Sequence, residues 1–137
     1  MIWIFIGFVA TDIYGNKVDF DGIVKEKHVV LNFWATWCNH CDEELDKLNK
    51  HFSDRDDIVI IAISQDTKRD IERVKSMAKS HGWKMPIVID DGKRISSQFA
   101  VLGLPTVIIF EKGGKLKKKV FGYNPKIVEI IRETLKL

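Results

Sequence analysis

Apolar residues along the chain follow patterns that predict alternating strands and helices. Three nearly continuous apolar runs predict strands buried on both faces, and they span 29–34 (VVLNFW), 58–63 (IVIIAI) and 106–110 (TVIIF). Apolar residues at helical spacing predict amphipathic helices over 41–52, over 67–81 and from Asn124-Pro125 onward. A short strand over 86–89 and a short helix or helical turn over 95–101 complete the order.

Two turns predict hairpins near the ends of this pattern. Tyr14-Gly15-Asn16-Lys17 separates two short extended stretches, which predicts an N-terminal β-hairpin. Lys112-Gly113-Gly114-Lys115 turns the third apolar run into a partner strand that ends near Phe121. Together the elements predict one α/β domain over residues 1–137, with a mixed central sheet and helices on both sides.

The chain opens with the unusually apolar stretch MIWIFIGFVA. This stretch is too short to span a bilayer, which takes ~20 apolar residues, and it lacks the basic n-region and cleavage site of an intact signal peptide. Residues 1–7 are therefore interpreted either as a leading buried strand or as the trimmed remnant of an anchor or signal segment.

Charge and cysteine content narrow the possible functions. A formal net charge of +3 is too small to argue for nucleic-acid binding. The basic run 112–119 is interpreted as lysines that protect a sheet edge, with a docking patch for an acidic partner or lipid headgroups as the alternative. The only two cysteines, Cys38 and Cys41, form a C-x-x-C pair that is redox-active, metal-binding or incidental. A zinc site normally needs four ligands and only His51 could join them, so no metal or other cofactor is expected.

The two cysteines differ in their predicted surroundings. Cys38 lies between the end of a buried strand and the start of a helix, where unpaired N–H groups and the helix dipole favour a thiolate. Cys41 falls on the buried stripe of the helix, together with Leu45 and Leu48. This asymmetry suits dithiol exchange, in which Cys38 attacks a substrate disulfide and Cys41 resolves the mixed disulfide.

The segment NFWATWCNHC, which ends at Cys41, resembles the active-site segment of the thioredoxin superfamily, and in particular its TlpA/ResA-type (redoxin) branch. Three other stretches are similar to that branch: 8–20 to its N-terminal hairpin, 58–81 to its central βα insertion, and Gly103-Leu104-Pro105-Thr106 to the cis-proline turn. The resemblance implies a thioredoxin-like fold and thiol–disulfide oxidoreductase activity on protein substrates.

The same resemblance implies roles for residues around the pair. It implies a cis peptide bond before Pro105, a Leu104 backbone that pairs with an extended substrate, and a Trp37 that shields Cys38 or contacts the partner. A proline that merely leads a strand is the alternative for Pro105. Asn39 and His40 separate the two cysteines.

His40 and three acidic residues have opposite expected effects on the Cys38 thiolate. A histidine next to the resolving cysteine stabilises that thiolate, whereas Asp42, Glu43 and Glu44 repel it. Relatives often have basic residues at these positions, and a proline where this chain has Asp46. The net effect, and with it the direction of electron flow, stays open at this stage.

A second open question concerns the acid that serves Cys41. Classical thioredoxins carry a buried aspartate where this chain has Asn32, and the TlpA/ResA branch often places an acid at the position of Asp66 instead. Asp66 is expected either to exchange a proton with Cys41 or to cap the following helix.

The main hypothesis is a bacterial dithiol–disulfide exchange protein that reduces exported proteins or apocytochromes. It implies an upstream thiol–disulfide electron donor, a monomer, and a location at the extracytoplasmic face of the membrane or in the periplasm, compatible with a tether upstream of residue 1. The alternatives are a thiol oxidant, a peroxiredoxin-like peroxidase, a non-catalytic thioredoxin-fold binding module, and a cytoplasmic location.

Overall fold

The computed structural model describes residues 7–137. Its elements, in chain order, are β1 (Val9–Thr11), β2 (Lys17–Asp19), α1 (Phe20–Glu26), β3 (His28–Trp34), α2 (Cys41–Phe52), β4 (Ile58–Ser64), η1 (Lys68–Asp70), α3 (Ile71–His81), β5 (Ile87–Ile89), η2 (Asp91–Lys93), α4 (Arg94–Gln98), β6 (Thr106–Glu111), β7 (Lys115–Phe121) and α5 (Ile127–Leu135). Residues 1–7 are interpreted from the sequence as a leading strand or as the remnant of an anchor or signal segment. All of them except Gly7 lie outside the described residues. Within residues 7–137, no helix is both long and apolar enough to cross a membrane.

The central sheet is mixed and has five strands in the order β5-β4-β3-β6-β7. β3, β4 and β5 run parallel, while β6 is antiparallel to both β3 and β7. The predicted N-terminal hairpin forms a separate two-stranded sheet of β1 and β2. The predicted central βα unit is present as β4 and α3, and its strand lies between β5 and β3. The α/β thioredoxin-like prediction is thus confirmed at the level of topology.

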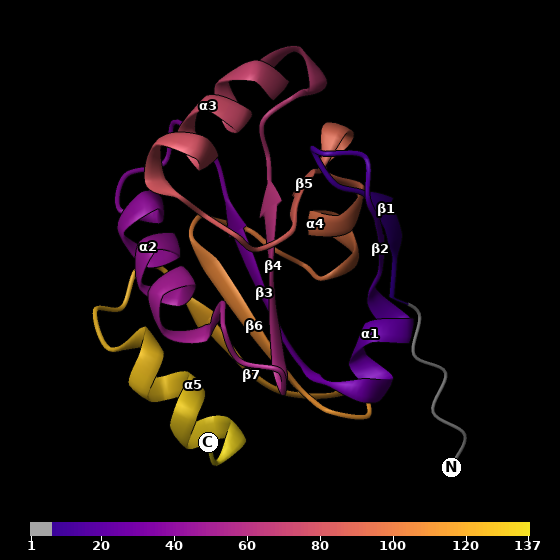
Figure 1. Cartoon of the computed structure of the whole chain (residues 1–137), viewed down its shortest axis with the longest axis vertical. Coiled ribbons are helices and arrows are strands. Elements are labelled where there is room, and N and C mark those ends of the chain that lie inside the picture. Colours follow the sequence, from indigo (N-terminus) through magenta and orange to yellow (C-terminus); the bar gives the residue numbers. More distant parts are fainter. Residues whose placement is uncertain (1–6) are drawn as a thin grey trace.

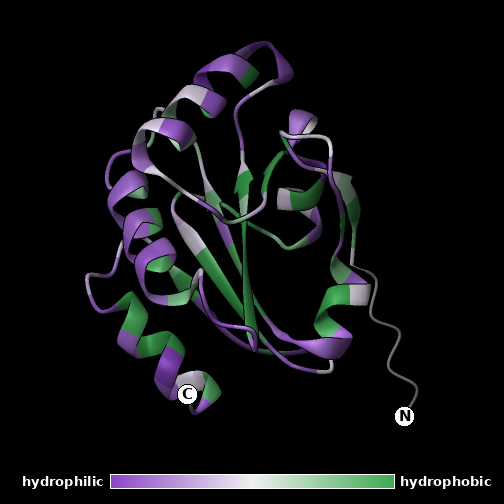
Figure 2. Ribbon diagram, viewed as in Figure 1, coloured by the Kyte–Doolittle hydropathy of each residue, from purple (hydrophilic) through white to green (hydrophobic). Residues whose placement is uncertain are grey.

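Helices cover both faces of the sheet (Figure 1). α2, α3 and α5 bury Leu45, Val74 and Ile131 in one hydrophobic cluster, together with alternate strand residues such as Val30. α1 and Phe99 contribute to the cluster on the opposite face, together with the other strand residues. Because successive side chains of a strand point to opposite faces, the continuous apolar runs bury both faces at once. Figure 2 shows mostly hydrophobic central strands and helices along which hydrophobic and hydrophilic residues alternate.

Three elements differ from the sequence prediction. Helix α1 was not predicted, because seven residues hold too few apolar positions to show a period; it is capped by Asp19, whose carboxylate accepts from the backbone N–H of Gly22. The second predicted helix begins as the short η1 and becomes α-helical only at Ile71. The last helix begins at Ile127, because Asn124 forms a turn in which its side chain accepts from the backbone N–H of Lys126.

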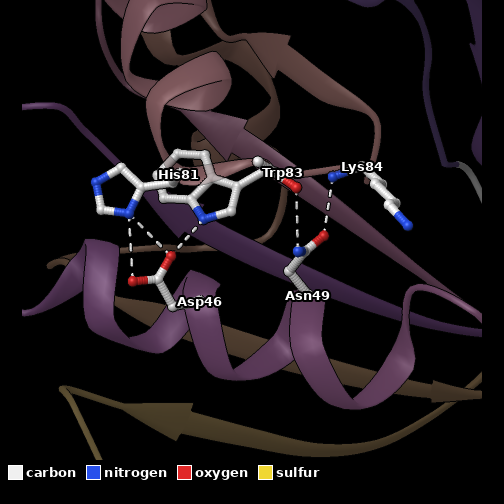
Figure 3. A network of polar contacts seen from close by, with 6 residues as sticks. Asp46, Asn49, His81, Trp83 and Lys84 are labelled. Atoms are coloured by element: carbon white, nitrogen blue, oxygen red, sulfur yellow. Dashed lines mark hydrogen bonds and ion pairs between the residues drawn. The ribbon is translucent and has the colours of Figure 1, made fainter.

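A polar network joins α2 to the end of α3 (Figure 3). The Asp46 carboxylate accepts from Trp83 Nε1 at 2.7 Å and lies 2.9 Å from Nδ1 of His81, which stacks on the Trp83 ring. One turn further along α2, the Asn49 side chain bonds the backbone of Gly82 and Lys84. Trp83 in turn packs edge-on against Trp34 at the end of β3, with ring centroids 5.2 Å apart. The network therefore couples the position of α2 to that of the core beneath it.

We expect replacement of Asp46 by alanine to lower the free energy of unfolding by about 1–3 kcal/mol, because the Trp83 N–H loses its acceptor in a largely buried setting. Asp46→Asn keeps one acceptor oxygen and loses only the ion pair with His81, so its loss should be about 1 kcal/mol or less. Denaturant unfolding of both variants checks this. Asp54→Ala, which removes an exposed ion pair to Lys84, is the control and should change stability by about 0.5 kcal/mol at most. Equal losses for the three variants would contradict the network's role.

Candidate active site

Cys38 and Cys41 form a disulfide at the junction of β3 and α2. Cys41, the first residue of α2, is fully buried, whereas Cys38 is only partly buried against the same cluster. Trp37, just before the pair, is 64% exposed. The predicted difference between a shielded and an accessible sulfur is therefore present in the fold.

A surface groove of about 330 Å³ lies in front of Cys38. It is lined by residues 35–40 together with Asp42, Glu43 and Met77. The groove thus combines the loop that carries the cysteine, the first turn of α2 and one side chain of α3. Cys38 lines this groove, whereas Cys41 does not and is fully buried.

His40 occupies the N-cap position of α2 in a left-handed conformation, with φ of 67°. Its side chain does not cap the helix, so the first-turn N–H groups and the positive end of the dipole stay available to a thiolate at Cys38. The ring stacks on Tyr123, with centroids 5.4 Å apart, and its Nδ1 lies 3.3 Å from Glu43 Oε1. Lys47 donates to the hydroxyl of Tyr123 at 2.9 Å and so holds the stacking partner in place.

Glu44 is the functional candidate that the sequence analysis misplaced. It was grouped with Asp42 and Glu43 as a repelling charge, yet its side chain is fully buried one helical turn from Cys41. Asn32 donates to its Oε1 at 2.7 Å, and the backbone N–H of Asn124 lies near the same carboxyl group. Burial raises the pKa of Glu44 from 4.5 to about 7, against the lowering effect of these donors and of Lys47. A proton can therefore be taken up or released here near neutral pH.

Two sequence signals could have located Glu44. A position three residues after Cys41 falls on the same helix face, so the buried stripe includes it. Asn32 is the one polar residue inside the apolar run of β3, and strand alternation places it on the face that α2 covers. A buried amide needs a hydrogen-bonding partner, and a facing carboxyl group on the helix supplies it.

Asp66 is buried at the end of β4 and fastens the loop that precedes Cys38. Its carboxylate accepts from the backbone N–H of Thr36 at 2.9 Å, from the Thr36 hydroxyl at 2.6 Å and from the Ser64 hydroxyl at 2.6 Å. The helix-cap interpretation is wrong, because the residue at the N-cap of η1 is Thr67 and no side chain caps that turn. Proton exchange with Cys41 stays a prediction; the contacts of Asp66 are those of an anchor.

The loop before β6 contains a cis Leu104–Pro105 peptide bond, as the resemblance implies. The loop is held by a bond from the Thr106 hydroxyl to the Gly103 carbonyl and by one from the Gly122 N–H to the Pro105 carbonyl. Leu104 is half-buried and packs against both clusters. Its pairing with a substrate strand stays a prediction. Within residues 7–137, no three His, Cys, Asp or Glu side chains gather as metal ligands.

A family model described as the AhpC/TSA family matches residues 4–119 of the chain. The chain belongs to this family. It is 34% identical over 119 residues to a protein named thiol-disulfide oxidoreductase ResA from Bacillus cereus, with 87% of this chain and 68% of that protein covered. A ResA of Bacillus subtilis is 31% identical over 118 residues, with 84% and 64% covered. The resemblance to ResA-type proteins is confirmed, and with it the enzyme class of thiol–disulfide oxidoreductases.

Solved structures agree on the fold. A secreted Mycobacterium tuberculosis disulfide oxidoreductase homologous to Escherichia coli DsbE matches with a TM-score of 0.79 at 20% identity, over 95% of this chain and 96% of that one. An exposed lipoprotein thioredoxin of Streptococcus pneumoniae matches with a TM-score of 0.73 at 26% identity, over 92% and 98%. This chain therefore shares its fold with both solved structures over almost its whole length.

The raised pKa of Glu44 predicts a specific dependence of stability on pH. The carboxyl group is favoured in its protonated form in the folded protein, so its contribution is fully present below pH 4.5 and is lost as the pH rises through about 7. Relative to the wild type, Glu44→Gln should therefore gain up to about 3 kcal/mol in unfolding free energy between pH 4.5 and pH 8. Denaturant titrations of the oxidised proteins across this range measure the difference. The exposed neighbour serves as control in Glu43→Gln, and parallel profiles for Glu44→Gln and wild type would contradict the assignment.

Proposed function

We propose that this oxidoreductase works as a protein-disulfide reductase whose substrates are exported proteins or apocytochromes. The observation that carries the proposal is the asymmetry of the pair: the groove opens onto Cys38, and Cys41 is sealed beneath it. Only one sulfur can meet a protein substrate, so the other acts after the first bond has formed.

The reaction starts from the dithiol form. The Cys38 thiolate attacks one sulfur of the substrate disulfide, forms the Cys38–substrate bond and releases one substrate thiolate. Cys41 then loses its proton and attacks the Cys38 sulfur, which breaks the mixed disulfide and releases the second substrate thiolate. Two electrons pass to the substrate, its two sulfurs take up two protons, and the protein is left with the Cys38–Cys41 disulfide. An upstream thiol–disulfide donor must reduce that bond again.

Glu44 is the group we assign to the proton of Cys41. It lies one helical turn away, shares the buried stripe, and has a pKa of about 7, which suits a base that works near neutral pH. Its buried Oε2 has no hydrogen-bonding partner among the described residues, so the oxygen is free to accept a proton. Asp66 keeps a positioning role in this scheme, since its oxygens are engaged by Thr36 and Ser64.

Substrate binding is assigned to the surface on either side of Cys38. Trp37 is exposed next to the sulfur and offers a flat apolar contact to a bound polypeptide. The Leu104 backbone, just before the cis-proline, is the proposed partner of an extended substrate strand. We further propose that the domain acts as a monomer at the extracytoplasmic face of a bacterial membrane or in the periplasm, held there by a tether upstream of residue 1. The secreted and lipoprotein character of the two structural relatives supports that location.

Reduction of insulin disulfides tests the function. We expect Cys38→Ser to abolish turnover, because no sulfur then faces the groove. Cys41→Ser should instead accumulate a mixed disulfide with the substrate, visible on a non-reducing gel, because the attacking sulfur is kept and the resolving one is lost. Undiminished reduction by Cys38→Ser would refute the assignment of the attacker, and the absence of a trapped adduct with Cys41→Ser would refute that of the resolver.

The proton-accepting role of Glu44 is tested by the resolving step itself. In rapid-mixing experiments, Glu44→Gln should slow the release of the second substrate thiol by about 10²-fold, while the first attack by Cys38 changes much less. The step should also lose its dependence on pH near 7. Glu43→Gln removes a neighbouring surface charge and should leave the pH dependence in place. A variant whose first and second steps slow equally would indicate a structural effect instead.

A further inference from the structure

The groove in front of Cys38 carries an excess of negative charge. Asp42 and Glu43 line it, and among the described residues His40 is the only basic side chain in its lining. The whole chain, by contrast, has a formal net charge of +3. The reaction site is therefore acidic on a protein that is basic overall.

These two carboxylates are largely free to act on a partner. In residues 7–137, Asp42 has no ion pair, and Glu43 meets only His40, at 3.3 Å. The closest cation along the same helix, Lys47, is engaged by the Tyr123 hydroxyl and the Pro125 carbonyl. Arg73 lies one turn before Met77 on α3 and does not line the groove.

The lysines responsible for the net charge lie elsewhere. Most of the basic run 112–119 belongs to the edge strand β7 and to the turn that leads into it. β6 is antiparallel to β3 and pairs Phe110 with Val29, so this turn lies at the start of β3. Cys38 follows the opposite end, about 20 Å away along a strand of seven residues. Figure 1 shows the β6–β7 turn and the start of α2 at opposite ends of the sheet.

We propose that Asp42 and Glu43 select substrates in which lysine or arginine residues flank the reacting cysteines. The proposal rests on the proposed function and specifies its substrate class as cationic polypeptide segments. Opposite charge at the rim raises the local concentration of such a segment at Cys38, while Lys112 and Lys115 at the β6–β7 turn repel it from the far end of the sheet. An acidic segment is repelled by Asp42 and Glu43 and therefore reaches the Cys38 sulfur less often.

Charge at the rim also acts on Cys38 itself, and the experiment must separate the two effects. A change in the reactivity of the thiolate alters the rates with all disulfides in the same proportion. Selection by the rim alters the ratio between cationic and anionic substrates. The ratio is therefore the quantity that reports on Asp42 and Glu43.

Two synthetic peptides, each closed by one disulfide and differing only in lysines or glutamates beside the cysteines, provide that ratio. The pre-reduced full chain is mixed with each peptide, and the second-order rate constants are divided by those of dithiothreitol to correct for the peptides' own reactivity. We expect the cationic peptide to react about 3- to 10-fold faster at 20 mM salt, on the order of the strength of exposed ion pairs. The preference should shrink towards one at 1 M salt, where the Debye length is about 3 Å.

A matched pair of double variants identifies the residues. Asp42→Asn with Glu43→Gln should remove most of the preference. Asp91→Asn with Glu129→Gln, two exposed acids outside the groove, changes the net charge equally and should keep it. A wild-type ratio of one or below, or a ratio unchanged in the groove variant, would overturn the proposal.

A neutral disulfide, bis(2-hydroxyethyl) disulfide, separates this result from the proposed function. Turnover of the neutral disulfide with no preference between the peptides leaves the oxidoreductase assignment intact and refutes the selection alone. Failure with all three disulfides would refute the proposed function and the selection together.

Discussion

The packing of α2 against the sheet is the constraint on which the chemistry of this protein depends. The helix must bury the stripe formed by Cys41, Leu45, Leu48 and Phe52, and this requirement fixes its rotation about its own axis. Once the rotation is fixed, Cys41 is sealed and Cys38, which precedes the helix, is left at its positive end. The difference in exposure between the two sulfurs is thus a consequence of the hydrophobic burial of α2.

The same rotation separates the three acidic residues that follow the pair. Glu44 turns inward, where burial favours its protonated form, while Asp42 and Glu43 stay at the rim of the groove. His40 does not face these charges alone, because its ring is stacked on Tyr123 and its Nδ1 lies beside Glu43. In the sequence, His40 and the three acids have opposite expected effects on Cys38. In the structure they have separate roles: Glu44 is a buried titratable group, Asp42 and Glu43 form an acidic rim, and His40 is stacked on Tyr123.

Much of the fold could be predicted from the sequence, because continuous apolar runs for strands and helical spacing for helices are both local patterns. The runs in β3, β4 and β6 are apolar on both faces, and α2 and α5 keep a regular helical period. α1 escaped because a seven-residue helix is specified by its Asp19 cap and by contacts across the sheet, which a period cannot reveal. In the site, the cysteine pair could be predicted from its C-x-x-C spacing, whereas the cis bond before Pro105 is implied by the family resemblance of residues 103–106.

Polar groups that act across the fold are harder to predict from local patterns. Whether a carboxylate faces water or protein depends on what lies opposite it: Asn32 for Glu44, Thr36 for Asp66, and Trp83 for Asp46. Asp46 makes the point most clearly, because the resemblance to the family implies a proline at this position and says nothing of what an aspartate would contact. In the folded chain this position connects α2 to α3 through a side chain, and Trp83 carries the contact on to Trp34 beside the active-site loop. The orientation of α2 is therefore supported by side-chain hydrogen bonds from Asp46 and Asn49, in addition to the buried stripe that contains Cys41.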